Sequence, residues 1–175
     1  MIVSKGQKCD TGTAFIAPTF KFGDDFDFTD SDISNSQFQN FNVGNNKFKN
    51  CSLAGTEYLK CNINACDFAE ADLTRATFKL SNFSKNTLAK ETWISTSFVD
   101  MQFRDIFFKD TLDGCFFENC AFYGATFQHA KLLNTFFINN KKFKRLKFID
   151  CIADRNTWAF LKTNQADLAG VTLLS

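Results

Sequence analysis

A large apolar residue recurs at every fifth position through most of this chain. Every fifth residue from Phe28 to Phe108 is large and apolar. The spacing shortens by one residue before Leu112, runs regularly to Phe137, lengthens by one before Phe143 and ends at Phe148. A period of five matches neither the ~3.6 residues of a helical turn nor the alternation of a strand, so the repeat itself must be the structural unit.

Two other positions of each repeat are also selective. Two residues before the large position lie small or thiol side chains: Cys51, Cys61, Cys66, Ala71, Ala76, Ser81, Cys115, Cys120, Ala125, Ala130 and Cys151. Two residues after it lie turn formers: Asp30, Asn35, Asn40, Asn45, Asn50, Gly55, Gly114, Asn119, Gly124, Asn134 and Asn139. Residues two apart on an extended segment face the same way, so a wide and a narrow position point inward together. Asn, Asp and Gly tolerate positive φ, which predicts a corner every five residues.

The repeat resembles that of the pentapeptide-repeat family, whose consensus is Ala, then Asp or Asn, then Leu and two variable residues. The clearest units are 71–75 (ADLTR) and 166–170 (ADLAG), and the resemblance spans about residues 26–152 and 166–175. The family implies an all-β, right-handed parallel β-helix with four sides and coils of roughly twenty residues, stacked at the ~4.8 Å strand spacing. Residues twenty apart should then stack, as along Phe28, Phe48, Phe68, Leu88 and Phe108.

We therefore expect one solenoid domain with short special segments at its ends. Residues 1–25 lack the five-residue spacing and are expected to form an N-terminal cap, followed by repeat coils over 26–152. Residues 153–165 interrupt the repeat, and their pattern predicts a short helix with Asp154 or Asn156 as its N-cap. Residues 166–175 return to the repeat.

Composition and charge narrow the class of protein. The 24 Phe among 175 residues match a repeated core position. The formal net charge of +1 gives no global field toward nucleic acid or an acidic membrane, so direct binding to either is not expected. The first twenty residues lack the apolar run of a signal peptide, and no stretch approaches the ~18 apolar residues of a membrane span, which favours a cytoplasmic protein.

The residues that could carry chemistry do not combine into a site. Six of the seven cysteines, all except Cys9, occupy the narrow inward position, where they are interpreted as buried free thiols. His129 is the only histidine and lies at a corner, so neither a catalytic triad nor a histidine metal site is expected. Carboxylates such as Asp67, Asp72, Asp100 and Asp105 fall outward on different repeats. We expect no enzyme activity, no cofactor and no metal.

Charge is nevertheless uneven along the expected axis. Acidic residues gather near the N-terminal end (Asp24, Asp25, Asp27, Asp30 and Asp32), and basic residues gather near the C-terminal end (Lys141, Lys142, Lys144, Arg145 and Lys147). These five basic residues are the candidate surface for an acidic partner. The chain is expected to be a monomer or a weak homodimer, with Leu174 as an outward apolar residue suited to self-association.

Three functions fit these features. The first is a non-enzymatic scaffold that binds another protein along its faces. The second comes from the resemblance, because bacterial quinolone-resistance and microcin-immunity members of the family bind DNA gyrase as acidic dimers that imitate duplex DNA. This chain departs from them in its net charge and lacks a C-terminal dimerisation helix in the sequence given. The third is a targeting module, similar to the β-helical part of bacterial secreted effectors.

Overall fold

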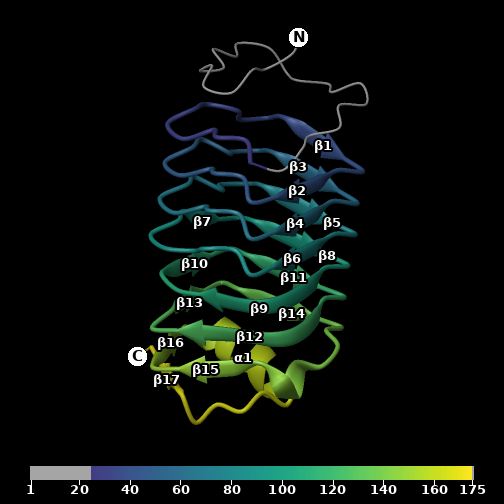
Figure 1. Ribbon diagram of the computed structural model, residues 1–175. Coiled ribbons are helices and arrows are strands. Elements are labelled where there is room, and N and C mark those ends of the chain that lie inside the picture. Colours follow the sequence, from purple (N-terminus) through teal and green to yellow (C-terminus); the bar gives the residue numbers. More distant parts are fainter. Residues whose placement is uncertain (1–24, 175) are drawn as a thin grey trace.

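The computed structural model describes residues 25–174, which wind into about seven turns of a parallel β-helix with one short helix near the C-terminal end (Figure 1). The expected fold class, a right-handed parallel β-helix with a helical interruption, is confirmed. The expected N-terminal cap, with Cys9 and Asp24, lies outside the described residues apart from Asp25.

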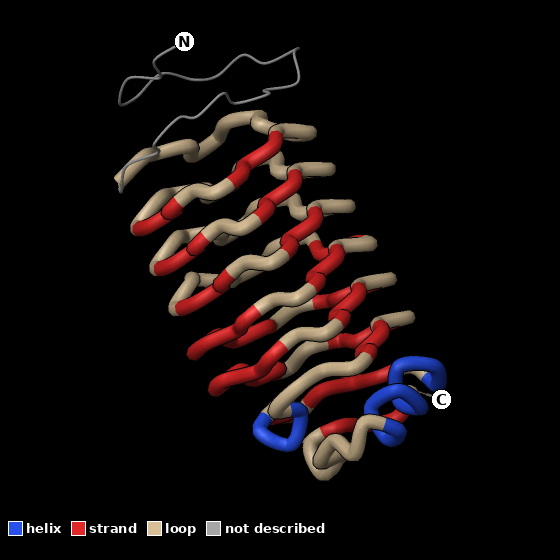
Figure 2. The backbone as a smooth tube through the Cα atoms, turned by 90° about the vertical axis from the view of Figure 1, so that its right-hand side faces the viewer, coloured by secondary structure: helices blue, strands red, loops and turns tan. Residues whose placement is uncertain are grey.

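Each coil has four sides, which we call faces one to four in chain order. In one coil their inward wide residues are Phe48, Leu53, Tyr58 and Ile63. Figure 2 shows the strands of successive coils one above another along the axis, with the helical segments confined to the C-terminal end.

Three parallel sheets follow these faces. Face three contains β1 (Gln37–Gln39), β3 (Glu57–Leu59), β5 (Thr77–Lys79), β8 (Ser97–Val99), β11 (Phe116–Glu118) and β14 (Phe136–Ile138). Face four, continuing onto face one in the later coils, contains β2 (Asn42–Gly44), β4 (Asn62–Asn64), β6 (Asn82–Ser84), β9 (Gln102–Phe108), β12 (Ala121–Gln128) and β15 (Lys147–Ile149). Face two contains β7 (Trp93–Ile94), β10 (Thr111–Asp113), β13 (Lys131–Leu133), β16 (Cys151–Ala153) and β17 (Val171–Leu173). Single parallel bridges complete faces one and two in the first coils.

The expected stacking of residues twenty apart is confirmed on every face. On face three, Phe38 pairs with Tyr58, which pairs with Phe78. Their rings are stacked with centroids 4.7 Å apart at each step. Each buried ring contributes about 1.5–3 kcal/mol relative to exposure, so the ladders form the main apolar core.

The two irregularities of spacing appear as changes of coil length. Trp93 pairs with Leu112, nineteen residues on, because the corner before Leu112 is one residue shorter. Phe127 pairs with Phe148, twenty-one residues on. The extra residue of that coil is taken up where the chain leaves the sheet and forms a 3₁₀ turn, η1 (Phe143–Arg145).

The corners adopt the left-handed backbone conformation at five-residue intervals. Every predicted turn former has positive φ, including Asn35 at 58° and Gly55 at 67°. Lys60, Ala65, Glu70, Arg75 and Leu80 also do so, although none of them is a turn former. An L-residue in this conformation costs roughly 1–2 kcal/mol, so stacking of the coils overrides local preference at these corners.

Asparagines at narrow positions complete corners that lack their own turn hydrogen bond. The Oδ1 of Asn86 accepts from the Cys66 amide at 2.8 Å, and its Nδ2 donates to the Ile63 carbonyl at 3.3 Å. Asn140 does the same for Cys120 and Phe117, at 2.8 and 2.9 Å. In both cases one carboxamide bridges a donor and an acceptor three residues apart in the preceding coil.

The narrow-position thiols also make hydrogen bonds. The Sγ of Cys66 donates to the Val43 carbonyl at 3.2 Å, and that of Cys120 donates to the Phe98 carbonyl at 3.3 Å. Thr96 and Thr135 donate in the same way to wide-position carbonyls of the preceding coil. The narrow position therefore does more than fill the core, because its thiol and hydroxyl groups also donate hydrogen bonds to the preceding coil.

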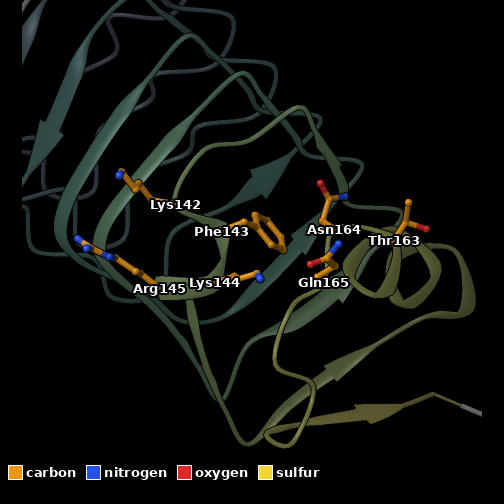
Figure 3. Close-up of a pocket in the computed structure, with 7 residues that line it drawn as sticks. All are labelled: Lys142, Phe143, Lys144, Arg145, Thr163, Asn164 and Gln165. Carbon is orange, nitrogen blue, oxygen red and sulfur yellow. The ribbon is translucent and has the colours of Figure 1, made fainter.

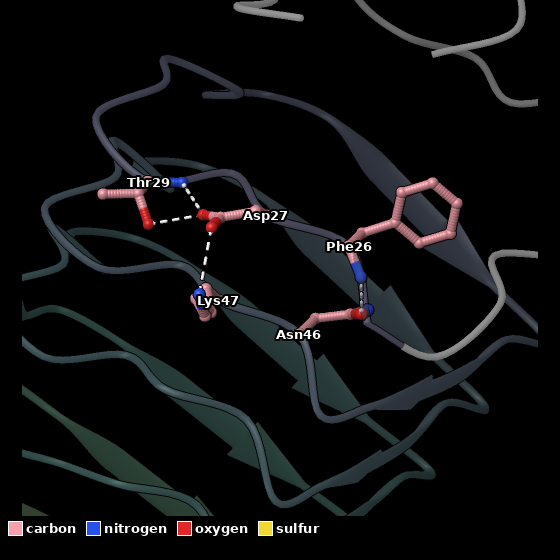
Figure 4. Close-up of polar contacts among 5 residues, drawn as sticks. All are labelled: Phe26, Asp27, Thr29, Asn46 and Lys47. Atoms are coloured by element: carbon pink, nitrogen blue, oxygen red, sulfur yellow. Dashed lines mark hydrogen bonds and ion pairs between the residues drawn. The ribbon is translucent and has the colours of Figure 1, made fainter. Parts of the chain in front are cut away.

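The first described coil is held to the second by side chains as well as by the backbone (Figure 4). The Phe26 amide donates to Asn46 Oδ1 at 2.7 Å. Asp27 accepts from the Thr29 hydroxyl at 2.6 Å and from Lys47 Nζ at 3.2 Å. Hydrogen bonds from Thr29, followed by the interaction with Lys47, lower the pKa of Asp27.

The helix α1 (Arg155–Thr163) closes the C-terminal end of face three. Asp154 is its N-cap, as one of the two predicted residues, and accepts from the Thr157 amide at 2.8 Å. Thr157 and Leu161 are buried against the last coil, and Trp158 is partly buried. The chain then returns to pair β17 with β16. Within residues 25–174 there is no helix long and apolar enough to cross a membrane.

Replacing Leu80 with Asn should stabilise the protein. Leu80 is a left-handed corner (φ 53°) with 47% of its surface exposed, and Asn adopts this conformation at lower cost. We expect a gain of about 0.5–1 kcal/mol in the free energy of unfolding, measured by urea denaturation. Lys79→Asn, which places the same residue one position earlier in β5, should be neutral or destabilising. Equal effects at both positions would contradict this account of the corners.

Replacing Asn86 with Ala should destabilise the protein by about 1–3 kcal/mol, because the Cys66 amide and the Ile63 carbonyl both lose their partner. The same measurement checks it. The control is Asn82→Ala, an exposed asparagine on the preceding face, which should change stability by no more than about 0.5 kcal/mol. A similar small loss at Asn86 would show that the bridging carboxamide is dispensable.

Candidate functional site

The five basic residues predicted as a docking surface lie together on the coil that contains the extra residue. We call Lys141, Lys142, Lys144, Arg145 and Lys147 the basic cluster. Lys141 pairs with Ala121 at the end of face four, Lys142 turns the chain with φ 58°, and Lys147 begins β15. All five side chains are exposed. The insertion that forms η1 therefore displays the cluster on a projecting turn.

A pocket of about 490 Å³ separates this turn from the end of α1. Its walls are Lys142, Phe143, Lys144 and Arg145 on one side and Thr163, Asn164 and Gln165 on the other. In Figure 3 the Phe143 ring and the Lys144 side chain extend toward the helix end, whereas Lys142 and Arg145 extend away from it. The cluster thus divides into one cation that faces the pocket and others on the outer surface.

Hydrogen bonds fix the far wall of the pocket. Asn164 Nδ2 donates to the Phe137 carbonyl at 2.9 Å and to the Phe160 carbonyl at 2.8 Å, which ties the helix end to the last strand of face three. Phe143 is buried and packs edge-on against Phe137, with centroids 5.5 Å apart. The two walls are therefore attached to the same core, while Lys144 and Gln165 remain at the surface.

The positive charge of the cluster is not neutralised within the described chain. The two ion pairs found between residues 25 and 174 are Lys47 with Asp27, at 3.2 Å, and His129 with Asp150, at 3.8 Å. Neither involves the cluster. An array of unpaired cations on one turn can hold carboxylates or other anions, and the neighbouring amide groups of Gln165 and Asn164 add polar surface.

The other candidate residues occupy the positions expected from the repeat. The six cysteines between residues 25 and 174 are all buried and unbridged. Burial raises the pKa of Cys115 and of Cys120 to about 12, which keeps these thiols protonated and unreactive. His129 is exposed at a corner with φ 53°. Within the described residues no group of three or more His, Cys, Asp or Glu side chains converges to hold a metal ion.

Glu91 is a buried carboxyl group that the sequence reasoning missed. It occupies a narrow position two residues before Trp93, is 5% exposed, and accepts a hydrogen bond from the Ala89 amide. Its Oε2 has no hydrogen-bond partner. Burial raises the pKa of Glu91 to about 7, and nearby Asp110 acts in the same direction. Glu91 does not line the pocket beside the basic cluster, so we regard it as a buried core residue, one coil before the short corner, with an unpaired carboxyl oxygen.

A smaller pocket of about 190 Å³ lies on face four. It is lined by Asn62, Asn82, Ser84, Gln102 and Arg104 from three successive coils. The sequence reasoning missed these residues, although the twenty-residue spacing of Asn62, Asn82 and the near-equivalent Gln102 was visible in it. Each is an outward neighbour of a wide core position, so the core register aligns them.

The fold is that of the pentapeptide-repeat proteins, as comparison with solved structures shows. No protein-family model and no curated protein matches the sequence. A trypsin-treated form of QnrB1, a plasmid-mediated fluoroquinolone resistance protein, aligns with a TM-score of 0.63 at 15% identity, covering 87% of this chain and 79% of that chain. A pentapeptide repeat protein from the Arabidopsis thaliana thylakoid lumen gives 0.42 at 23% identity, over 63% and 66% of the two chains.

Stability should fall as pH rises through the range in which Glu91 ionises. Because its pKa is raised from 4.5 to about 7 in the folded protein, ionisation favours the unfolded state between these values. Glu91→Gln should remove this dependence and raise stability at pH 8 by on the order of 2 kcal/mol. Urea denaturation from pH 5 to pH 8 measures both effects.

The control for this prediction is Glu57→Gln, which removes the same charge from an exposed position in β3. This variant should follow the pH profile of the unaltered protein. If Glu91→Gln also follows it, the Glu91 carboxyl group does not ionise within the fold in this range.

Proposed function

We propose that this protein is a non-enzymatic scaffold that binds an acidic segment of a partner protein through its basic cluster. The observation that carries the proposal is the gathering of five exposed cations on the η1 turn and the residues directly flanking it, outside both ion pairs of the described chain. Such a patch steers and holds an acidic partner, and it does so more strongly at low salt.

The rest of the prism supports a binding role over catalysis. Its core is occupied by stacked apolar side chains, its described thiols are buried, and the basic pocket contains no carboxylate or histidine that could act as acid or base. A rigid scaffold needs only an exposed surface held in fixed geometry. The solenoid provides one, because each outward residue is positioned by an inward neighbour.

The proposal is tested with a short fluorescein-labelled poly-glutamate peptide, whose binding is measured by fluorescence anisotropy. Lys142→Ala/Lys144→Ala/Arg145→Ala should weaken binding about tenfold, since each exposed ion pair contributes about 0.2–1 kcal/mol. The control Lys49→Ala/Lys79→Ala/Lys90→Ala removes the same charge from faces one and three and from a corner, and should have little effect. Equal losses in both variants, or no binding by the unaltered protein at low salt, would overturn the proposal.

DNA gyrase is the second candidate partner, favoured by the fold similarity to a fluoroquinolone resistance protein. Gyrase supercoiling in the presence of a quinolone should then be protected by the purified protein. Absence of protection at several-fold excess would remove this candidate. Capture of a eukaryotic protein from host lysate, dependent on the basic cluster, would favour the third function, a targeting module of a secreted effector.

A further inference from the structure

Face four presents two columns of outward polar side chains beside the basic cluster. One column contains Asn62, Asn82 and Gln102, which are register partners on β4, β6 and β9. The other contains Asn64, Ser84 and Arg104 on the same strands. The columns flank the pocket of about 190 Å³ described above. Because the wide core residues between them are locked in register, the groove has a fixed shape.

The column of carboxamides is available to a ligand. Asn62, Asn82 and Gln102 are exposed, and no side-chain hydrogen bond within the described residues occupies their amide groups. In the second column, Ser84 donates to Asn64 Oδ1 at 2.9 Å. Arg104 has its guanidinium carbon 5.5 Å from the centre of the Tyr123 ring, which restrains the cation beside the groove.

The carboxamide column is in line with the basic cluster, with Ala121 in the coil between them. Gln102 pairs with Ala121, and Ala121 pairs with Lys141, so Lys141 lies two coils beyond Gln102 on the same face. At ~4.8 Å per coil this separation is about 10 Å. Along the axis, face four therefore carries neutral amides on β4, β6 and β9, with the Arg104 guanidinium beside Gln102 on β9, and the basic cluster two coils later.

We infer that face four binds a partner segment in extended conformation, with the acidic part on the basic cluster and Arg104 and a neutral part on the carboxamide column. The inference rests on the proposed function and specifies how the same partner segment is placed along face four. A carboxamide offers one donor and one acceptor group, which matches a peptide group, and a guanidinium binds a carboxylate with two parallel hydrogen bonds. The backbone of the segment hydrogen-bonds to the carboxamide column, and its acidic side chains bind Arg104 and the basic cluster.

The distribution of charge favours a peptide over a nucleic acid on this face. A nucleic acid carries a phosphate at every step and needs cations along its whole length. On the strands of face four the outward residues of β4 and β6 are neutral, and the first cation is Arg104, beside Gln102 on β9. The cations nearest the earlier strands, Lys60 and Lys85, lie at the corners of the coils and not on the face. A segment that changes from neutral to acidic along its length matches this order.

The test uses a fluorescein-labelled peptide with an acidic half, Glu-Asp-Glu-Glu, joined to a neutral half, Ser-Gly-Ser-Gly. Asn82→Ala/Gln102→Ala should weaken its binding about tenfold. The control Gln37→Ala/Gln39→Ala removes two exposed amides from face three and should leave binding unchanged. A second peptide, N-methylated on the backbone of the neutral half, keeps every charge but lacks those N–H donors. On the unaltered protein it should bind about tenfold more weakly than the unmethylated peptide. On the Asn82→Ala/Gln102→Ala variant the two peptides should bind with the same affinity.

The outcomes separate this inference from the proposed function. If the basic-cluster variant loses binding while the Asn82→Ala/Gln102→Ala variant and the N-methylated peptide do not, the carboxamide column has no part and the inference fails alone. If the labelled peptide does not bind the unaltered protein at low salt, both fail. Equal binding of duplex DNA of similar charge, lost in the Asn82→Ala/Gln102→Ala variant, would also overturn the inference in favour of a general anion groove.

Discussion

A left-handed corner at every fifth residue is the backbone constraint on which the structure depends. It turns the chain through four sides per coil and brings residues about twenty apart into parallel register. Each wide apolar side chain therefore stacks on the wide side chains of the coils before and after it. The stacking in turn holds residues such as Leu80 and Arg75 in the left-handed conformation, which is unfavourable for them in isolation. Corners and core therefore stabilise one another, and neither is set by local sequence only.

The same arrangement separates the inside of the prism from its surface. Inward positions alternate with outward ones, so the core fixes where every surface side chain lies without using that side chain itself. Inward backbone groups that lack a turn hydrogen bond find side-chain partners. Asn86 and Asn140 each accept from one backbone N–H and donate to one backbone carbonyl of the preceding coil. Among the described residues the exceptions are Glu91 Oε2, Tyr58 Oη and Trp93 Nε1, buried polar atoms without a hydrogen-bond partner.

Much of the fold could be predicted from the sequence because the five-residue period is local and nearly unbroken. The wide positions, the corners, both changes of spacing and the Asp154 cap are all found where they were expected. The candidate site was predicted only in part. The basic cluster is a run in the sequence, but the wall formed by Thr163, Asn164 and Gln165 depends on how α1 folds back against face three. The Asn62, Asn82 and Gln102 column becomes a surface only when coils stack, and the role of Asn86 depends on which corner lacks its own hydrogen bond.

The short coil and the long coil have a consequence for how such a molecule can change in length. One pairs Trp93 with Leu112 after nineteen residues and the other pairs Phe127 with Phe148 after twenty-one, so each returns the chain to the same face whatever its length. Whole coils can then be gained or lost between the carboxamide column and the basic cluster without turning either off its face. Each coil gained or lost would change the distance between the carboxamide column and the basic cluster by one strand spacing. That distance can therefore change only in steps of ~4.8 Å.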